Sequence, residues 1–216
     1  MKYVLVACEC SQNVCKAFRS KGCLSFSCDI QPCYGGHREW HIVGDMFNVY
    51  QDNVTFFTED GLSHFVPHWD LVIAHPPCTY LAKSGSCNLV KYVNGHRILD
   101  PLRYKKLLAA RSFFIRIIDL RPAATYLCIE NPIPIRDAQL PPPTQRVEPY
   151  CFGDNRSKFT YLWLYGGLEH FPLLVFSFTP PSGVISICKT HRSARLRSEF
   201  SPAIAKAMAE RWACLE

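Results

Sequence analysis

Two short apolar runs, each ending at a proline, constrain the fold of this chain more than any other feature. One covers residues 69–74 and continues into His-Pro-Pro-Cys at 75–78, and the other covers residues 125–129 and continues into Glu-Asn-Pro at 130–132. Both have the length and the β-branched or aromatic content of buried strands. Because proline fixes φ and donates no backbone hydrogen bond, both runs are expected to end in loops.

Strand-like and helix-like segments alternate along the whole sequence. We expect strands at residues 2–8, 24–28, 41–44, 70–74, 126–129, 159–164 and 184–188, and helices at residues 13–21, 101–119 and 202–214. Pro101 and Pro202 suit a first helical turn, and Gly22 suits a helix end. The alternation predicts an α/β fold, a mostly parallel sheet with helices on both faces.

Size and composition indicate a soluble globular protein. The 216 residues suffice for one domain with a substantial core, and 48% of them are hydrophobic while 19% are charged. No apolar run reaches the length of about 18 residues that a membrane helix needs, and the apolar start is too short for a signal peptide. We therefore expect a cytoplasmic protein.

Twelve cysteines raise the question of disulfides or a metal. Several lie inside strand-like runs, and a reducing compartment favours thiols that pack as small apolar groups. One spacing resembles a zinc site, namely Cys28, Cys33, His37 and His41. The alternative, a loop whose histidines are solvated or touch substrate, fits Pro32 and the glycines there better. We predict no metal.

Basic residues are concentrated in two places. The formal net charge is +6, with one cluster at residues 189–197 and another at residues 97–111. Each cluster is either a solvated surface or a phosphate contact. We consider Arg192, Arg195 and Arg197 for phosphate contact, and residues 84–86 with 92–95 as a mobile loop.

Several of the expected strand ends carry side chains that could take part in catalysis or bind a ligand. In open α/β sheets ligands bind at the carboxyl ends of strands, so Cys78 and Glu130 could face one pocket as nucleophile and acid. The turn after the first strand, residues 7–14, has no glycine, so a cofactor without a pyrophosphate suits it better. Asp29 could accept ribose hydroxyls or simply cap a turn, and Asp45 could bind an adenine amino group.

These motifs carry a family resemblance over most of the chain. The order of residues 9–11 (Glu-Cys-Ser), 29 (Asp), 44–45 (Gly-Asp), 76–78 (Pro-Pro-Cys) and 130–132 (Glu-Asn-Pro) resembles the DNA cytosine carbon-5 methyltransferases, most closely the short phage-type members. Residues 152–164 and 204–212 are also similar to that group. The resemblance implies a Rossmann-like class I methyltransferase fold, with S-adenosylmethionine as cofactor and DNA, duplex or single-stranded, as substrate.

The resemblance also assigns roles to individual residues. Cys78 would add to carbon 6 of cytosine, Glu130 would protonate ring nitrogen 3, and Asn131 would hold the loop. Lys158 or Arg156 would be the basic residue that family members place near the cytosine or the phosphate backbone. The cofactor site would consist of Cys8, Glu9, Ser11, Asp29, Ile30, Asp45 and Pro76.

The chain also departs from the larger enzymes of that family. It lacks their long variable insert, so we expect a single catalytic domain over residues 1–216 without a large target-recognition domain. Because a small domain buries too little surface for a typical specific DNA interface, a weak or very short sequence preference follows. Residues 9–11 and 201–203 replace motifs that contact the cofactor in the larger enzymes.

Other functions compete with this prediction. A DNA amino-methyltransferase needs Asp, Asn or Ser before the two prolines, to accept the amino hydrogens, and an aromatic residue after them, to stack on the base. His75 and Cys78 occupy these two positions here and fit both roles poorly. A carbon-5 modifying enzyme that acts on a cytosine or uracil mononucleotide would not need the missing insert. A catalytically silent nucleic-acid-binding protein of the same fold would explain the altered cofactor loop but not the intact Cys78 and Glu130.

Overall fold

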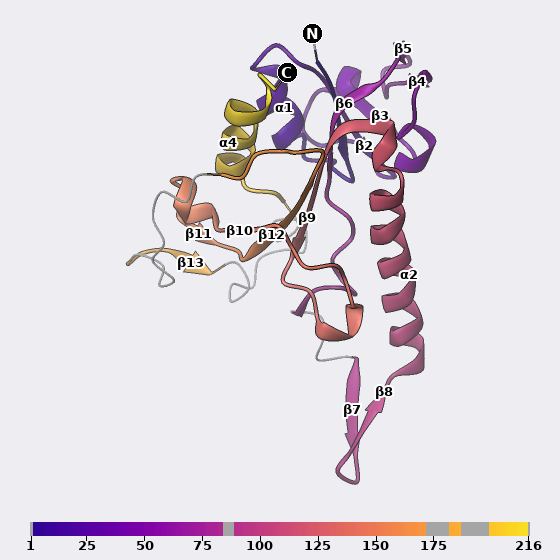
Figure 1. Cartoon of the computed structure of the whole chain (residues 1–216), viewed down its shortest axis with the longest axis vertical. Coiled ribbons are helices and arrows are strands. Elements are labelled where there is room, and N and C mark those ends of the chain that lie inside the picture. Colours follow the sequence, from indigo (N-terminus) through magenta and orange to yellow (C-terminus); the bar gives the residue numbers. More distant parts are fainter. Residues whose placement is uncertain (1, 84–88, 172–181, 187–198, 216) are drawn as a thin grey trace.

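The computed structural model describes residues 2–83, 89–171, 182–186 and 199–215 (Figure 1). Its centre is a seven-stranded sheet with the order β10-β12-β9-β6-β1-β2-β3. These strands are β1 (Tyr3–Ala7), β2 (Leu24–Asp29), β3 (His41–Val43), β6 (Trp69–Ala74), β9 (Ala124–Pro132), β10 (Gln145–Val147) and β12 (Thr160–Tyr165). Five of them, from β3 to β9, are parallel neighbours.

Strand β12 reverses the direction of the chain at one side of this sheet. It lies between β9 and β10 and is antiparallel to both. The sheet is therefore mostly parallel, and the predicted α/β fold with a mostly parallel sheet is confirmed by this topology. The strand order reverses between β1 and β6, which are paired directly. Ligands of open α/β sheets bind at such a reversal, outside the carboxyl ends of the strands.

Helices cover both faces of the sheet, as predicted. Helices α1 (Asn13–Arg19) and α4 (Pro202–Trp212) pack together on one face, and α2 (Pro101–Asp119) covers the other (Figure 1). Alternating residues of β1 supply the two cores: Leu5 faces α2, whereas Val4 and Val6 face α1 and α4. This alternation follows from the two-residue period of a strand, and both faces are apolar because both are covered.

The predicted helix limits are close to the observed ones. Helix α2 has the predicted bounds, and the Asp100 carboxylate caps it by accepting the Arg103 N–H at 2.9 Å. Helices α1 and α4 each end two residues before the predicted limit. Gly22, at φ +82°, lies in the turn after α1 and not in the helix.

Several elements were not predicted. They are the antiparallel hairpins β4 (Val54–Phe57) with β5 (Ser63–Val66) and β7 (Val90–Val93) with β8 (His96–Leu99), the strand β10, and the short strand β11 (Arg156–Ser157). Strand β13 (Ile185–Ser186), which pairs with β11, lies within the strand predicted at residues 184–188. The 3-10 helices are η1 (Arg38–Trp40), η2 (Met46–Asn48), η4 (Arg121–Ala123), η5 (Arg136–Ala138) and η6 (Pro149–Phe152). The prediction of a mobile loop at residues 92–95 is therefore wrong, because those residues form the tip of a paired hairpin. Residues 84–86, 187–188 and the basic cluster 189–197 lie outside the described residues.

Buried thiols belong to the cores. Cys15, Cys23, Cys28 and Cys128 are buried and unbridged, and burial raises the pKa of Cys15 and Cys28 to about 12. They therefore pack as neutral apolar groups, as expected. Within the described ranges, no helix has the length and apolar character needed to cross a membrane.

Candidate active site

A cavity of about 610 Å³ opens at the carboxyl ends of β1, β2, β6 and β9. The loops that follow these strands form most of its wall, and Lys158, Glu199 and Phe200 close it. It brings together most of the residues predicted for catalysis and cofactor binding, namely Cys8, Glu9, Ser11, Asp29, Pro76, Cys78, Glu130 and Lys158. Its volume lies within the range of about 300–1,000 Å³ that is typical of small-molecule sites.

Strand register places His75 beside Glu130. Strands β6 and β9 are parallel neighbours in which Ala74 pairs with Ile129, so the next residue of each strand follows side by side. The His75 ring donates its Nδ1 hydrogen to Oε2 of Glu130 at 3.0 Å. Both side chains are largely buried, and the His75 ring also contacts Phe200 with ring centroids 4.8 Å apart. The pair is thus fixed at the cavity wall.

The surroundings of Glu130 favour its charged form. Burial by itself raises the pKa of this carboxyl, but the His75 hydrogen bond and the positive charge of Lys158 outweigh it, and the pKa lies below its ordinary value. Oε1 of Glu130 and Nε2 of His75 are buried without a hydrogen-bond partner among the described residues. Since buried polar atoms are usually paired, these two atoms are candidates for contact with a bound molecule.

Asn131 lies in β9 and contacts the proline loop that follows β6. The expectation that Glu130, Asn131 and Pro132 form a loop is wrong, because β9 continues to Pro132 and all three residues are paired with β12. Asn131 is completely buried, and its Nδ2 donates a hydrogen bond to the Pro76 carbonyl at 3.2 Å. Backbone bonds continue the connection, because the Ile135 N–H donates to the Leu81 carbonyl at 2.7 Å and Lys83 donates to Ile133. Asn131 therefore positions the loop that carries Cys78 against the end of β9, without lining the cavity itself.

Lys158 is held at the cavity by a buried carboxylate. Glu148 accepts the backbone N–H of Lys158 at 3.1 Å and the Ser157 hydroxyl at 3.2 Å. Arg156, the second candidate for the basic role, points elsewhere: its guanidinium forms a two-pronged ion pair with Asp154. Of the two residues considered, the structure places Lys158 in the cavity.

Glu9 closes the loop between β1 and α1. Its carboxylate accepts the N–H groups of Val14 at 2.8 Å and Cys15 at 3.2 Å, and the Ser11 hydroxyl at 3.2 Å. The carboxylate thus satisfies the first turn of α1, where the helix leaves N–H groups unpaired. Cys8, just before it, has φ +59°, a left-handed conformation that turns the chain sharply in the absence of a glycine.

The loop after β2 lies over the loop after β1. Gln12 donates to the His37 carbonyl at 2.7 Å and accepts the His37 N–H at 3.0 Å, while Tyr34 donates its N–H to Cys10. At Gly35 a Cβ atom would lie 2.5 Å from the Ser11 carbonyl oxygen. A glycine is therefore required in the second loop, whereas the first loop makes its turn without one.

The predicted cofactor residues after β2 and β3 divide into two groups. Asp29 lines the cavity, and its Oδ1 accepts the Gln31 N–H at 2.9 Å, which leaves Oδ2 for a ligand. Ile30 is 76% exposed and lies outside the cavity wall. Asp45 is exposed and caps η2 by accepting the Phe47 N–H at 3.0 Å, so it too lies outside the wall.

Three thiols line the cavity, and two of them are disfavoured as nucleophiles. Burial and the nearby Asp29 raise the pKa of Cys8 and, to a smaller extent, that of Cys10. A thiol with a raised pKa forms little thiolate at neutral pH. Cys78 follows two prolines at the end of β6, and its carbonyl accepts the N–H groups of Leu81 and Ala82 in a tight turn.

The structure adds residues that sequence reasoning did not assign. Phe200 and Glu199 reach the cavity just before α4, and Tyr34 reaches it after β2. No periodicity or motif indicated them, because they come from irregular segments. His75 was considered only as a possible contact, yet its position next to Pro76 at a strand end was the signal that could have assigned it.

The cysteine and histidine spacing does not form a metal site. His41 contacts the Ser27 hydroxyl and the Gln31 carbonyl, each at 2.9 Å, and His37 bonds Glu39 and stacks on Trp40. Within the described parts of the chain, no three His, Cys, Asp or Glu side chains converge in a way that could hold a metal ion.

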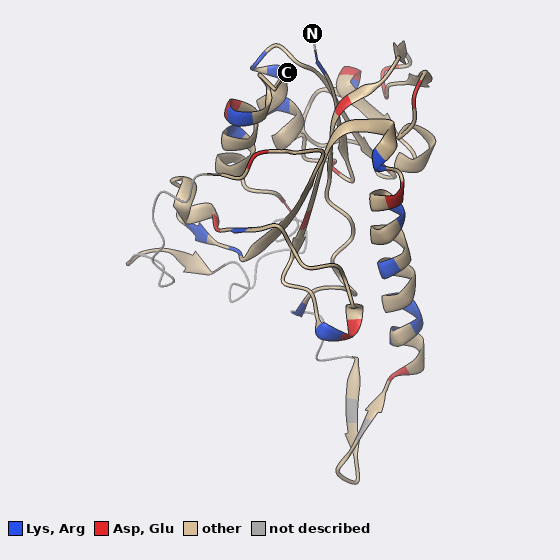
Figure 2. Ribbon diagram, viewed as in Figure 1, with Lys and Arg blue, Asp and Glu red and all other residues tan. Residues whose placement is uncertain are grey.

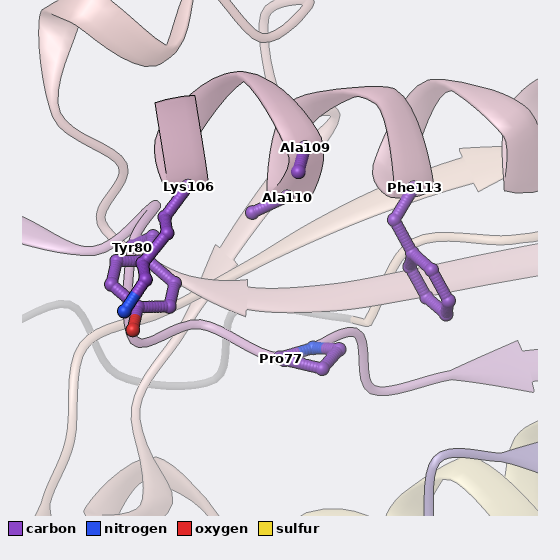
Figure 3. A pocket seen from close by; sticks show the side chains of 6 residues that line it. All are labelled: Pro77, Tyr80, Lys106, Ala109, Ala110 and Phe113. Carbon is purple, nitrogen blue, oxygen red and sulfur yellow. The ribbon is translucent and has the colours of Figure 1, made fainter. Parts of the chain in front are cut away.

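A second, apolar hollow of about 340 Å³ lies on the other side of Pro77 (Figure 3). Helix α2 contributes Lys106, Ala110 and Phe113, and the loop after β6 contributes Pro77 and Tyr80. Figure 3 shows the Lys106 side chain descending from the helix toward the Tyr80 ring, and its Nζ lies 5.5 Å from the ring centroid. The first turns of α2 are thus in contact with the loop that carries Cys78.

Comparisons with known proteins give limited information. No protein-family model matches the sequence, and no curated protein matches it. Among solved structures, a prophage-encoded protein of E. coli described as a DNA modification methyltransferase is similar, with a TM-score of 0.44 and 11% identity. The match covers 76% of this chain and 46% of that one, so the chain spans less than half of its length.

Proposed function

We propose that the protein transfers a methyl group from S-adenosylmethionine to carbon 5 of cytosine in DNA, through a covalent adduct with Cys78. The observation that carries the proposal is the cavity at the strand ends, which Cys78, Glu130 and Lys158 line together. The resemblance to cytosine carbon-5 methyltransferases assigns these same residues to the reaction.

Cys78 would act first, because carbon 5 of cytosine is a poor nucleophile. Its thiolate forms a bond to carbon 6, and the electron pair of the C5–C6 double bond shifts toward ring nitrogen 3. Glu130 gives a proton to that nitrogen, which leaves a neutral enamine with a nucleophilic carbon 5. The other cavity thiols, Cys8 and Cys10, are poorly suited to this step because their pKa values are raised.

The protonation of Glu130 sets a condition for this chemistry. The His75 hydrogen bond and the charge of Lys158 hold the pKa of Glu130 below its ordinary value, which favours the carboxylate. The His75–Glu130 pair therefore has to carry the proton for ring nitrogen 3 when the cytosine is bound. The 3.0 Å hydrogen bond allows His75 and Glu130 to share that proton. Oε1 of Glu130, which has no partner among the described residues, is the atom offered to ring nitrogen 3.

The cavity also fits the cofactor. Asp29 offers a carboxylate oxygen to ribose hydroxyls at the end of β2, while Cys8, Ser11 and Pro76 line the wall toward the catalytic loop. When bound there, S-adenosylmethionine supplies an electrophilic methyl group on a sulfonium sulfur. Ile30 and Asp45 would contribute at most from the cavity rim, since they do not line it.

Cys78 and Glu130 would also complete the reaction. After carbon 5 has taken the methyl group, its proton passes to solvent and the electrons re-form the C5–C6 double bond. The bond between Cys78 and carbon 6 breaks, the thiolate leaves, and Glu130 recovers the proton from ring nitrogen 3. In DNA the cytosine has to leave the base stack to reach Cys78.

The decisive experiment is a trap with 5-fluorocytosine. A fluorine at carbon 5 blocks the loss of the proton, so a duplex that contains it should stay attached to the protein in the presence of S-adenosylmethionine. We expect a denaturant-resistant complex whose modified peptide contains Cys78, and no complex with Cys78→Ser. Cys214→Ser is the matched control, since this exposed thiol lies outside the cavity and should be trapped normally.

Labelled methyl transfer defines the substrate. We expect transfer to duplex or single-stranded DNA, abolished in Cys78→Ser and retained in Cys214→Ser. Transfer to free dCMP alone would replace DNA by a mononucleotide substrate. Transfer that survives the Cys78→Ser substitution would rule out the covalent mechanism, and binding of DNA without any transfer or adduct would favour a silent nucleic-acid-binding protein.

A further inference from the structure

The hairpin formed by β7 and β8 stands apart from the rest of the fold. Among the residues that the structure describes, its strands pair only with each other and belong to no larger sheet. Figure 1 shows it extending away from the central sheet, beyond the N-terminal end of α2. An isolated two-stranded hairpin is marginally stable in water, so one that projects from a protein is expected to have a partner.

The base of the hairpin is firmly attached. Leu89 is buried in the core under α2, and Val90 and Leu99 pack against that core. The Asp100 N–H donates to the Leu89 carbonyl at 2.9 Å, and the Asp100 side chain caps α2. The hairpin is therefore held in a fixed direction relative to α2.

The outer part of the hairpin exposes apolar and aromatic side chains. Tyr92 is 74% exposed, and Val93 and Ile98 are about half exposed. Asn94 and Gly95 both have positive φ, which is the Asn-Gly two-residue turn that matches the twist of paired strands. A tight, defined turn at the tip makes the hairpin a compact ribbon instead of a loop.

The segment that contains the hairpin, residues 71–118, is strongly basic. From residue 71 to residue 118 the sequence has eight Lys or Arg residues and only one carboxylate, that of Asp100. Two of the basic residues, Lys91 and Arg97, belong to the hairpin strands by sequence. Others follow along α2 (Figure 2). A one-signed basic segment of this kind favours a polyanionic partner.

This segment adjoins the candidate active site. Arg103 and Lys106, in the first two turns of α2, both lie over the ring of Tyr80, at 5.0 and 5.5 Å from its centroid. Tyr80 is two residues from Cys78 in the same loop (Figure 3). The start of α2, which follows the hairpin directly in the sequence, is thus in contact with the catalytic loop.

We infer that the β7–β8 hairpin is the duplex-reading element of the protein, a ribbon that enters the major groove next to the target base. This inference rests on the proposed function and supplies what the missing recognition insert would provide. The groove, about 12 Å wide and 8.5 Å deep, admits a two-stranded ribbon. Strands of four residues reach about 13 Å, enough to bring Tyr92 to the base edges.

A second copy of this chain is the competing occupant. Two copies of the hairpin would bring basic segments together without carboxylates to pair with, apart from Asp100, which caps α2. Like charges at close range oppose such an interface, whereas DNA phosphates complement it. The charge therefore favours duplex DNA over self-association.

The test uses two hairpin variants of the full-length protein. In Lys91→Glu/Arg97→Glu the charge is reversed, and in the shortened variant an Asn-Gly turn replaces residues 91–98 and joins Val90 to Leu99. Binding to a fluorescent two-turn duplex is measured by anisotropy over a range of salt concentrations. We expect binding at least tenfold weaker for both, and for the charge variant a salt slope shallower by about two, since each lost phosphate contact changes the slope by about 0.9.

The control is Lys21→Glu/Lys206→Glu, which reverses two exposed charges on the α1 and α4 side of the molecule. Its net charge equals that of the hairpin variant, so a general electrostatic effect would weaken both equally and overturn the inference. Unchanged duplex binding by the shortened variant would also overturn it. A change in sedimentation from dimer to monomer on shortening, with duplex binding retained, would assign the hairpin to self-association.

The readouts separate this inference from the proposed function. Methyl transfer to a short single-stranded oligonucleotide needs the cavity but not the hairpin, so we expect it to be retained in both hairpin variants. Equal losses on duplex and single strand would mean that the hairpin supports the cavity, against the inference. If the wild type binds duplex through the hairpin without any transfer or trapping, the proposed function fails while the inference stands.

Discussion

At the scale of single residues, the chemistry of Glu130 depends on its neighbours in space. The sequence indicates a carboxyl at a strand end, but its protonation depends on burial, on His75 and on Lys158. None of these contacts is local: His75 is 55 residues away along the chain. The protonation of Glu130, and with it a pH-dependent part of the stability, therefore depends on contacts between residues that are distant in the sequence.

The lowered pKa of Glu130 makes a prediction about stability. A carboxyl with a pKa lower in the folded than in the unfolded state stabilises the fold above its ordinary value of 4.5, and this contribution is lost as the pH falls through the folded value. We compare the wild type with Glu130→Gln, which has the same shape but does not ionise. The free energy of unfolding of the wild type, relative to the variant, should decrease from pH 5 to pH 3.

Urea titrations at several pH values measure this difference. Other carboxyls, such as Glu9 with its raised pKa, are present in both proteins and cancel in the comparison. A difference that is constant from pH 5 to pH 3 would show that Glu130 has no pKa shift on folding.

Glu9 makes a second residue-level prediction. Its carboxylate satisfies the buried N–H groups of Val14 and Cys15, which Glu9→Ala would leave without partners. Such a loss costs about 1–3 kcal/mol, so urea unfolding should show a free energy lower by about 2 kcal/mol. Glu210→Ala, which removes only an exposed i,i+4 ion pair with Lys206, should change it by less than about 0.5 kcal/mol. Equal effects would contradict the capping role.

At the scale of elements, the loops after β1 and β2 act as a unit. Gly35 approaches the Ser11 carbonyl so closely that a Cβ atom there would lie 2.5 Å from the oxygen. Gly35→Ala should push the two loops apart and, on the proposed function, weaken S-adenosylmethionine binding at least tenfold by isothermal titration calorimetry. It should also lower the melting temperature by several degrees.

Gly44→Ala is the matched control for this change. Gly44 has no positive φ and no atom within 4 Å of the added Cβ, so its melting temperature should remain close to that of the wild type. If Gly35→Ala melts like Gly44→Ala and binds the cofactor normally, the two loops do not depend on each other.

At the scale of the whole molecule, the sheet separates two cores. Ile117 on α2 belongs to one core and Ile204 on α4 to the other, and both are buried. Ile→Val at either site should cost about 1 kcal/mol of unfolding free energy, and the double variant should cost the sum within about 0.5 kcal/mol. A larger deviation, measured by urea unfolding, would show coupling through the sheet.

The strands and helices of the central fold could be predicted because local pattern determines them. Residues 69–74 and 101–119 have the apolar period and the proline signals of their elements, and the structure has β6 and α2 at those places. The hairpins β4–β5 and β7–β8 were missed because their short strands are partly exposed and carry no continuous apolar run. Ile30 and Asp45 were placed in the cofactor site from sequence order, but they lie outside the cavity wall.

The sequence by itself determined the fold class and the loop that carries Cys78, because strand-like runs and proline restrict the backbone locally. It did not determine the position of Glu130, which lies within β9 and not in the predicted loop. Only the tertiary structure decided that His75 bonds Glu130, that Lys158 and not Arg156 reaches the cavity, and that Glu9 caps a helix. Those outcomes depend on strand order and register. Register brings together residues that are distant in sequence, and no local pattern encodes such a contact.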